Sequence, residues 1–64
     1  MKTITKEYKD YYMFITIHHS LIEVSVHSYT DDNFKYTDKF ILHSAEEVFE
    51  TICYRIDNNL LKVA

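Results

Sequence analysis

The chain has 64 residues, a formal net charge of −3 at pH 7, one cysteine, and no glycine or proline. Without glycine it cannot form phosphate-cradling loops, dinucleotide-binding fingerprints or nucleophile elbows, because these motifs need glycine where the backbone approaches a ligand or adopts a positive φ. The negative charge and the scattered basic residues argue against binding to a nucleic-acid backbone, which usually requires clustered lysine and arginine.

Alternating residue types predict two strands in the first half of the chain. We expect residues 1–9 to form a flexible N-terminal arm, followed by a strand over 11–17 and a second strand over 22–27. Both segments alternate with a period of two, and the second is rich in β-branched residues. The two strands are therefore expected to pair as a hairpin.

The turn between these two strands sets their register. If Ser20-Leu21 is a two-residue turn, Ile17 faces Val24, and the apolar residues of both strands lie on one face. Primed turns favour asparagine or glycine, and this segment contains neither. A four-residue turn over 19–22 with a slipped register is therefore the alternative.

The clearest turn signal is Asp31-Asp32-Asn33, where Asn33 suits a left-handed position in a three-residue loop. Closing this loop predicts a third strand over 34–42, in which Asp38 falls opposite Val26 on the apolar face. We therefore expect either a bulge near 37–39 or an edge at which the carboxylate reaches water.

A helix is predicted after the third strand. Ser44-Ala45-Glu46-Glu47 matches a capping box, in which the serine hydroxyl accepts an early helix N–H and Glu47 reaches back to the serine N–H. Apolar residues then recur at spacings of three and four, as on one face of a helix; they are Ala45, Val48, Phe49, Ile52, Ile56 and Leu60. We expect the helix to end near Asn58-Asn59, with 60–64 forming a last turn or a short extended tail.

These elements predict an α+β fold with the order β-β-β-α. The expected architecture is a single domain over residues 1–64, in which one C-terminal helix packs on one face of a three-stranded antiparallel meander. A chain of this length has a marginal core, and its single cysteine, Cys53, excludes an internal disulfide. We therefore expect oligomerisation, most simply as a homodimer.

The sheet face that the helix leaves uncovered is the first candidate for function. In the register above, Tyr12 lies opposite Tyr29 and Phe14 opposite His27, and Ile41 lies on the same face. A solvated sheet face does not normally gather such residues, and aromatic side chains anchor protein interfaces. We predict an interface here, and the pattern fits either a second copy of the chain or a different protein.

The titratable residues favour neither a metal site nor an active site. His18 and His19 are adjacent on a strand and so point to opposite faces, which makes joint ligation awkward. A cross-strand pair between His18 and Glu23 explains this histidine better. Cys53 has no predictable histidine nearby and is expected to be a packing residue. We expect no enzyme activity, no cofactor and no bound metal.

Acidic residues offer a second kind of contact. Small acidic proteins can occupy the DNA-binding groove of an enzyme by imitating spaced phosphates. Ten acidic residues against seven lysine and arginine residues is a mild bias. We therefore expect a mixed acidic and aromatic surface, with Glu23, Asp31 and Asp32 as the candidate acidic contacts.

The rarity of residues with GC-rich codons indicates an AT-rich genome, so we expect a low-GC bacterium or its phage as the source. The segment 39–42, Lys-Phe-Ile-Leu, and the following Ser44-Ala45-Glu46-Glu47-Val48 resemble the third strand and helix start of the uracil-DNA glycosylase inhibitors of Bacillus phages. Those inhibitors are homodimers that occlude the DNA-binding cleft of the enzyme and grip a protruding apolar side chain. The resemblance implies that Phe40 is the strand aromatic at the partner-facing pocket.

The leading hypothesis is a small phage protein that binds and blocks a host defence or DNA-metabolism protein in the host cytoplasm. No apolar stretch approaches the length of a membrane span. One alternative is a nucleic-acid or small-ligand binding sheet that uses Tyr12, Phe14 and Tyr29. Another is a structural subunit of a bacterial complex.

Overall fold

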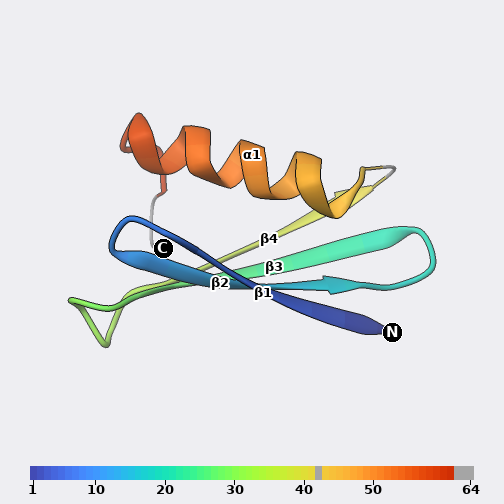
Figure 1. Ribbon diagram of the computed structural model, residues 1–64, viewed down its shortest axis with the longest axis horizontal. Helices are drawn as coiled ribbons and strands as arrows, with labels where there is room; N and C mark the ends of the chain where they lie inside the picture. The colour runs from blue at the N-terminus through green and yellow to red at the C-terminus, as the bar shows by residue number, and fades with distance from the viewer. Residues whose placement is uncertain (42, 62–64) are drawn as a thin grey trace.

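The computed structural model describes residues 1–41 and 43–61. Four antiparallel strands form one sheet in the order β1-β2-β3-β4, and a single helix follows them (Figure 1). The elements are β1 (Lys2–Tyr8), β2 (Tyr11–Ile17), β3 (Leu21–Ser28), β4 (Lys35–Ile41) and α1 (Ala45–Asp57). The α+β class, the meander and the C-terminal helix are confirmed, but the sheet has one strand more than predicted.

The additional strand is β1, which occupies most of the segment expected to be a flexible arm. It pairs with β2 along its whole length, from Lys2 opposite Ile17 to Tyr8 opposite Tyr11. The prediction missed it because an edge strand needs few apolar residues, and here a lysine interrupts the inward-facing side. The turn after β1 also lacks a recognisable sequence signal. Its left-handed position, with φ 54°, is occupied by Lys9, whereas glycine or asparagine is usual at such a position.

The pairing of β2 with β3 differs from the prediction by two residues. Ile17 lies opposite Ile22 instead of Val24, and the His18 N–H donates to the carbonyl oxygen of Leu21 at 2.8 Å to close the turn. The turn is thus centred one position earlier than either predicted turn. A shift of two residues keeps every side chain on its predicted face, because side chains alternate with a period of two.

The register between β3 and β4 also shifts by two residues, which places Asp38 opposite Val24 instead of Val26. The loop between β3 and β4 is longer than predicted, and hydrogen bonds from side chains to the backbone stabilise it. Ser28 Oγ accepts the N–H groups of Thr30 and Asp31, at 3.1 and 3.2 Å. The carboxylate of Asp31 accepts the Asn33 N–H at 3.0 Å. β4 pairs without interruption from Lys35 to Ile41, so the second of the two predicted alternatives is confirmed: there is no bulge in this strand, and the Asp38 carboxylate reaches water at the sheet edge.

The predicted capping box at the start of α1 is confirmed. Ser44 Oγ accepts the Glu47 N–H, and the Glu47 carboxylate accepts the Ser44 N–H, both at 3.1 Å. This hydrogen bond from the Ser44 backbone is the main reason why the pKa of Glu47 lies below its usual value. The helix ends at Asp57 and is capped by Asn58, as predicted. Residues 60 and 61 are not helical, and residues 62–64 of the predicted tail, like Leu42, lie outside the described residues.

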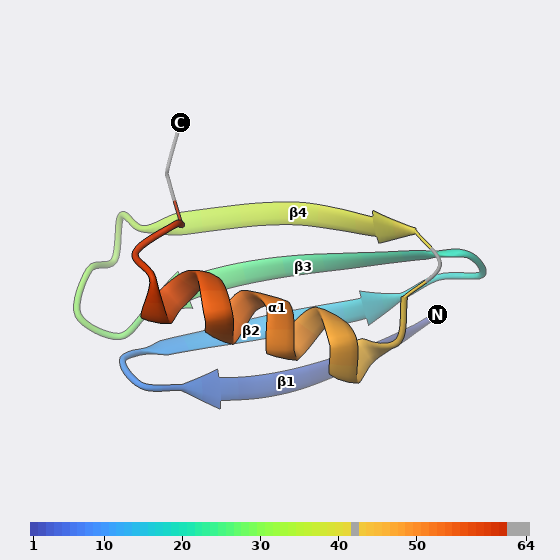
Figure 2. The ribbon, with the colours of Figure 1, turned by 90° about the horizontal axis from the view of Figure 1, so that it is seen from above.

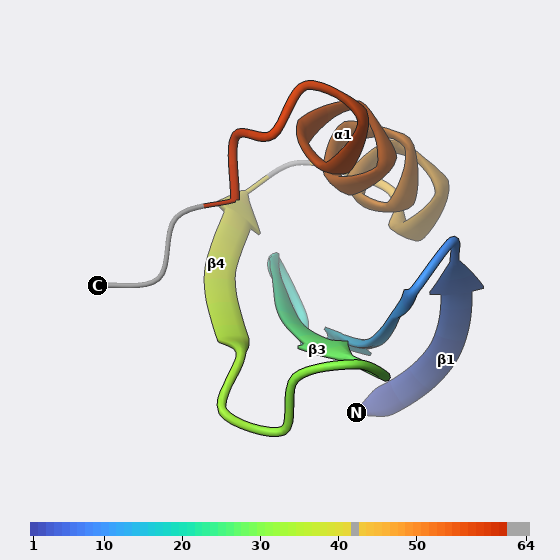
Figure 3. The ribbon, with the colours of Figure 1, turned by 90° about the vertical axis from the view of Figure 1, so that its left-hand side faces the viewer.

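The core lies between α1 and the two central strands (Figure 2). Its fully or almost fully buried side chains are aliphatic or methionine: Met13, Ile15, Ile22, Val24, Val26, Val48 and Ile52. The edge strands contribute partly buried side chains, because the sheet bends so that β1 and β4 rise on either side of the helix (Figure 3). Among the described residues, no helix is long and apolar enough to cross a membrane.

Polar contacts hold both edges of the sheet to the helix. At one edge, the Tyr8 hydroxyl donates to Asp57 at 2.7 Å, and Lys9 forms an ion pair with the same carboxylate. At the other edge, Arg55 donates to Asp38 at 2.7 Å and to the Tyr36 hydroxyl at 2.6 Å. Desolvation alone would raise the pKa of Asp38, but its hydrogen bonds, led by that from Arg55, outweigh this effect and lower the pKa.

Candidate interaction surface

The face of the sheet opposite α1, called the outer face below, is built by strict alternation along all four strands. Its residues are Thr3, Thr5 and Glu7 on β1, Tyr12, Phe14 and Thr16 on β2, Leu21, Glu23, Ser25 and His27 on β3, and Lys35, Thr37, Lys39 and Ile41 on β4. No helix of the described residues covers this face, since α1 lies on the other side (Figure 1). The predicted assignment of side chains on β2, β3 and β4 to the two faces is therefore confirmed.

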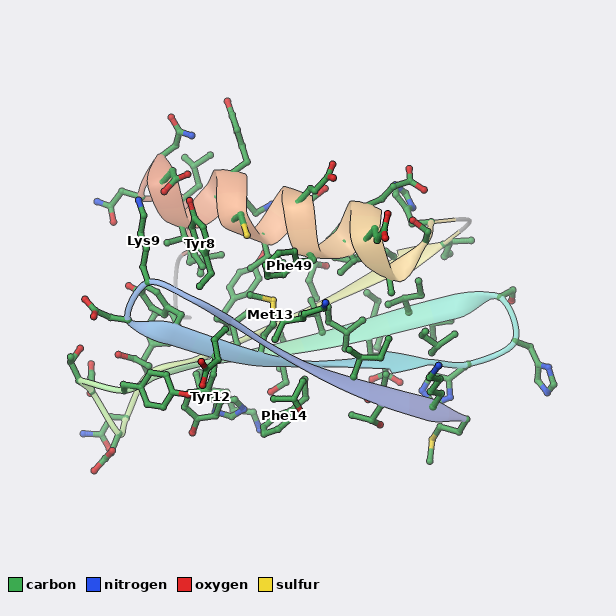
Figure 4. The ribbon with its side chains drawn as sticks, viewed as in Figure 1. Tyr8, Lys9, Tyr12, Met13, Phe14 and Phe49 are labelled. Atoms are coloured by element: carbon green, nitrogen blue, oxygen red, sulfur yellow. The ribbon has the colours of Figure 1, made fainter. Side chains whose placement is uncertain are left out.

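Four rings gather at one end of the outer face and form the aromatic cluster, which consists of Tyr12, Phe14, His27 and Tyr29. The Tyr12 ring centroid lies 4.7 Å from that of Tyr29 and 5.2 Å from that of His27. Phe14 lies 5.8 Å from Tyr12 and 5.5 Å from His27 in edge-to-face arrangements. Figure 4 shows Tyr12 and Phe14 on the side of the sheet away from α1, whereas Met13 points toward it. The structure thus brings together four residues that were predicted to share an interface.

Hydrogen bonds hold two of these rings in place. The His27 ring nitrogen Nε2 lies 2.8 Å from Ser25 Oγ. The Tyr29 hydroxyl donates to the carboxylate of Glu7, and the Tyr29 N–H donates to the carbonyl oxygen of Asp10 at 2.8 Å. The cluster is nevertheless open to solvent, with Phe14 38% and Tyr29 56% exposed. Ordered and exposed aromatic rings are suited to binding another molecule, because little side-chain entropy is lost on contact.

A groove continues the outer face beyond the aromatic cluster. It has a volume of about 710 Å³. Its lining mixes apolar and polar side chains, among them Met1, Phe14, Thr3, Thr16, Ser25, Thr37, Glu23 and Lys39. His18 Nε2 lies 2.9 Å from a Glu23 carboxylate oxygen at the groove, which confirms the predicted cross-strand pair. The outer face therefore has an aromatic half and a hollowed half of mixed polarity.

Opposite charges on the outer face balance. Glu7 and Lys35 stand on the two edge strands, and Glu23 lies directly opposite Lys39 on neighbouring strands. Within the described part of the chain, neither lysine forms an ion pair with a carboxylate. The face has no excess of positive charge that would attract a phosphate backbone.

Two of the predicted interface residues lie apart from the aromatic cluster. Phe40 is on the helix side of β4, where it is half-buried and its ring lies 5.4 Å from the guanidinium of Arg55. Ile41 is on the outer face and 64% exposed, but at the far end of β4. Phe40 cannot join the outer face, because even-numbered residues of β4 point toward the helix.

The three predicted acidic contacts do not form one surface. Glu23 lies in the groove and is paired with His18. Asp31 and Asp32 lie in the loop after β3, at the opposite end of that strand, where Asp31 stabilises the loop by accepting the Asn33 N–H. Any acidic contribution from these residues therefore comes from two separate places.

Sequence reasoning missed the contribution of β1 to this surface. Thr3, Thr5 and Glu7 extend the outer face by one strand, and Glu7 positions the Tyr29 ring. The alternation of these residues with Ile4 and Tyr8 was the one pattern in the sequence that indicated a strand here. It was weak because Lys6 occupies the inward position between them.

The remaining reactive groups are explained by packing. Cys53 is half-buried on α1, and burial, with the nearby Asp57 carboxylate, raises the pKa of its thiol, which disfavours the nucleophilic thiolate. Among residues 1–41 and 43–61, no three histidine, cysteine or acidic side chains are grouped closely enough to hold a metal ion.

No protein-family model, curated protein or solved structure matches the chain. The case for a function therefore rests on the outer face itself. An ordered aromatic cluster, a neighbouring groove and balanced charges are typical of a surface that contacts another macromolecule.

Proposed function

We propose that this chain is a non-enzymatic binding protein that blocks a host protein, as a phage-encoded inhibitor of a defence or DNA-metabolism protein does. The observation that carries this proposal is the aromatic cluster on the uncovered face of the sheet. Its rings contact one another at centroid distances of 4.7 to 5.8 Å and remain accessible. Contacts between rings on neighbouring strands stabilise a sheet only modestly, so a binding role accounts better for aromatic rings that remain exposed.

The chemistry of the face supports a protein as the partner. Aromatic residues supply the large contact area of interface hot spots, and the surrounding polar residues supply a rim. The rim here carries both signs of charge, from Glu7 and Glu23 to Lys35 and Lys39. A rim that carries both signs of charge suits the mixed charges of a protein partner better than it suits the uniformly negative backbone of a nucleic acid.

The resemblance to the uracil-DNA glycosylase inhibitors supports a DNA-binding enzyme as one target class. The segment that carries this resemblance includes the end of β4 and the capped start of α1. The exposed Asp32 at the loop tip and the partly buried Glu23 would add negative charge toward a basic cleft. Phe40, half-buried beside Arg55, would then act from the helix side of the molecule.

Capture of partners from a lysate of a low-GC bacterial host tests the proposal. The tagged wild-type chain is compared with Tyr12→Ala/Phe14→Ala, and with Tyr54→Ala as a control, because Tyr54 is 63% exposed on the helix. We expect the double variant to lose at least roughly tenfold in capture, about 1.4 kcal/mol, and the control to behave as wild type. The outer face is needed for capture in two cases. The host protein can contact this face directly, or it can contact a dimer whose two copies associate through this face.

A functional assay completes this test. The purified target should lose its activity on addition of the wild-type chain and keep it on addition of the double variant. Circular dichroism must show that the double variant retains its fold. If the variant captures and inhibits the target as well as the wild type does, the outer face is not the functional surface and the proposal is wrong.

A second candidate function is binding of single-stranded nucleic acid or a small planar ligand. It is favoured by one observation, the exposed rings of Phe14 and Tyr29 on either side of the partly buried Tyr12, on a sheet that also presents Lys35. Bases stack on such rings, and binding through phosphates weakens steeply with salt. Fluorescence anisotropy with labelled oligonucleotides at low salt tests nucleic-acid binding, and failure to bind any of them removes nucleic acid as the ligand.

A further inference from the structure

We infer that the occupant of the outer face is a second copy of this chain, packed face to face about a two-fold axis that runs along the strands. The inference rests on the proposed function only in taking the outer face as a binding surface. It adds the identity of the partner at that surface and the orientation in which it binds.

The first argument is a row of residues that crosses the whole sheet. Glu7, Tyr12, His27 and Lys35 lie directly opposite one another on β1, β2, β3 and β4. The row reads acid, aromatic, aromatic, base, with the charges at the two edges and the rings on the central strands. A two-fold axis along the strands reverses the order of the strands in the facing copy. It therefore places Glu7 opposite Lys35 of the second copy, twice, and brings the aromatic rings of the two copies together between the central strands at that end of the sheet.

The other in-plane axis, perpendicular to the strands, does not give this match. It lays each strand against its own reversed copy, so that Lys35 meets Lys39 of the second copy at two places. Glu7 would then lie against Thr3. Like charges placed opposite each other are unfavourable, whereas the axis along the strands pairs opposite charges.

The charges that would pair are available. Lys35 has no carboxylate partner among the described residues, and Glu7 accepts a hydrogen bond from a tyrosine without neutralising its charge. Both side chains are exposed at the edges of the face. Long side chains are needed there, because the sheet bends toward the helix and the edges of two facing sheets stand farther apart than their centres (Figure 3).

The size and packing of the face fit a small dimer. Four strands spaced ~4.8 Å apart and seven or eight residues long give a face of roughly 19 by 23 Å. Two such faces bury roughly 870 Å² together, which is below the ~1,200 Å² at which standard stable interfaces begin, so we expect a weak dimer with a dissociation constant in the micromolar range or above. Aligned sheets pack at about 30° in sandwiches, which an axis along the strands permits. The product has four layers, with the two helices on the outside and the aromatic clusters buried between the sheets.

Charge reversal at the two edge positions tests this arrangement in solution. Glu7→Lys alone sets two lysines against each other at both edges, and Lys35→Glu alone sets two glutamates against each other. Each single variant should raise the dimer dissociation constant by roughly tenfold or more in sedimentation equilibrium. An equimolar mixture of the two variants should form a heterodimer, because one copy then carries both lysines and the other both glutamates. Glu46→Lys, on the exposed side of α1, is the control and should not change the constant.

Zero-length crosslinking supplies a second measurement on the wild-type chain. Within one copy Glu7 and Lys35 stand three strand spacings apart, about 14 Å, with Tyr12 and His27 between them. A carbodiimide should therefore join them only between copies, and mass spectrometry of mixed light and heavy chains should show the mixed-isotope product.

The outcomes separate this inference from the proposed function. A wild-type chain that stays monomeric at hundreds of micromolar overturns the inference, as does a dimer that Lys35→Glu strengthens, which indicates the other axis. If the chain is monomeric and the outer-face variant still loses capture of a host protein, that protein is the occupant and the proposed function stands. Circular dichroism and thermal unfolding of each variant show whether a lost dimer reflects a lost fold.

Discussion

The two faces of the sheet are made by the same strands but behave differently. On the helix side of β2 and β3, Met13, Ile15, Val24 and Val26 are at most 1% exposed. On the outer side of these strands, Phe14 is 38% exposed although it lies between Met13 and Ile15 in the chain. The fully buried core consists of aliphatic and methionine side chains, and aromatic rings of the covered face, such as Tyr11, Phe34 and Phe49, pack around it while partly buried. Core residues and outer-face residues thus alternate along each strand, so each face can be perturbed alone.

The sharpest test of this separation compares neighbours on β2. Ile15→Ala removes a fully buried side chain and should lower the free energy of unfolding by about 3 kcal/mol, enough to unfold much of a marginal 64-residue domain. Phe14→Ala should cost about 1 kcal/mol or less. Urea denaturation at low protein concentration measures both. Equal losses in the two variants would mean that the outer face is part of the core.

A second pair of neighbours tests the sheet edge at β4. Asp38→Ala removes the acceptor for Arg55 and Tyr36 and should cost about 1 to 2 kcal/mol of unfolding free energy, because the guanidinium remains partly buried without its partner. Lys39→Ala, on the outer side of the same strand, should change stability by less than about 0.5 kcal/mol. Thermal unfolding of the two variants gives the comparison. A larger loss for Lys39→Ala would contradict the assignment of the faces.

The two faces of the sheet differ because α1 covers one of them. A change that destabilises the N-terminus of α1 should therefore weaken the packing of the covered face and leave the outer face unchanged. Ser44→Ala removes one half of the capping box and should cost about 1 kcal/mol. Ser44→Asp, which can still accept the Glu47 N–H, should restore most of this loss. Equilibrium denaturation followed by circular dichroism measures both variants. An unchanged stability of Ser44→Ala would show that the cap does not hold the helix on the sheet.

Acid should affect the covered face through Asp38. Its pKa lies below the usual value of 3.8 in the folded chain, so the folded state binds this proton less readily than the unfolded state does. The resulting stabilisation is present above pH 3.8 and is lost as the pH falls through the lower, folded pKa. The difference in stability between the wild type and Asp38→Asn should therefore shrink between pH 5 and the lowest pH at which the chain remains folded. A difference that grows on acidification would mean that the pKa of Asp38 is raised.

Much of the covered face and of the aromatic cluster could be predicted from local patterns. The alternation along 11–17 and 22–27 and the capping box at Ser44 depend on neighbours a few residues away, so they are visible without the fold. The aromatic residues at 12, 14, 27 and 29 were assigned to one surface because a period of two survives an error of two in register. Phe40, by contrast, was placed at the partner surface by resemblance, whereas its parity on β4 directs it toward the helix.

What the sequence by itself determined is which side chains share a face, because the pleat of a strand and the turn of a helix impose their periods on any chain. Only the tertiary structure decided which residues lie opposite one another. Loop lengths depended on the side-chain hydrogen bonds of Ser28 and Asp31, and the edge strand β1 on its contacts with β2. The partner of Asp38 is Arg55, 17 residues away in the chain, which no local pattern encodes. The row from Glu7 to Lys35 exists for the same reason, since it forms only when four strands are paired in one register.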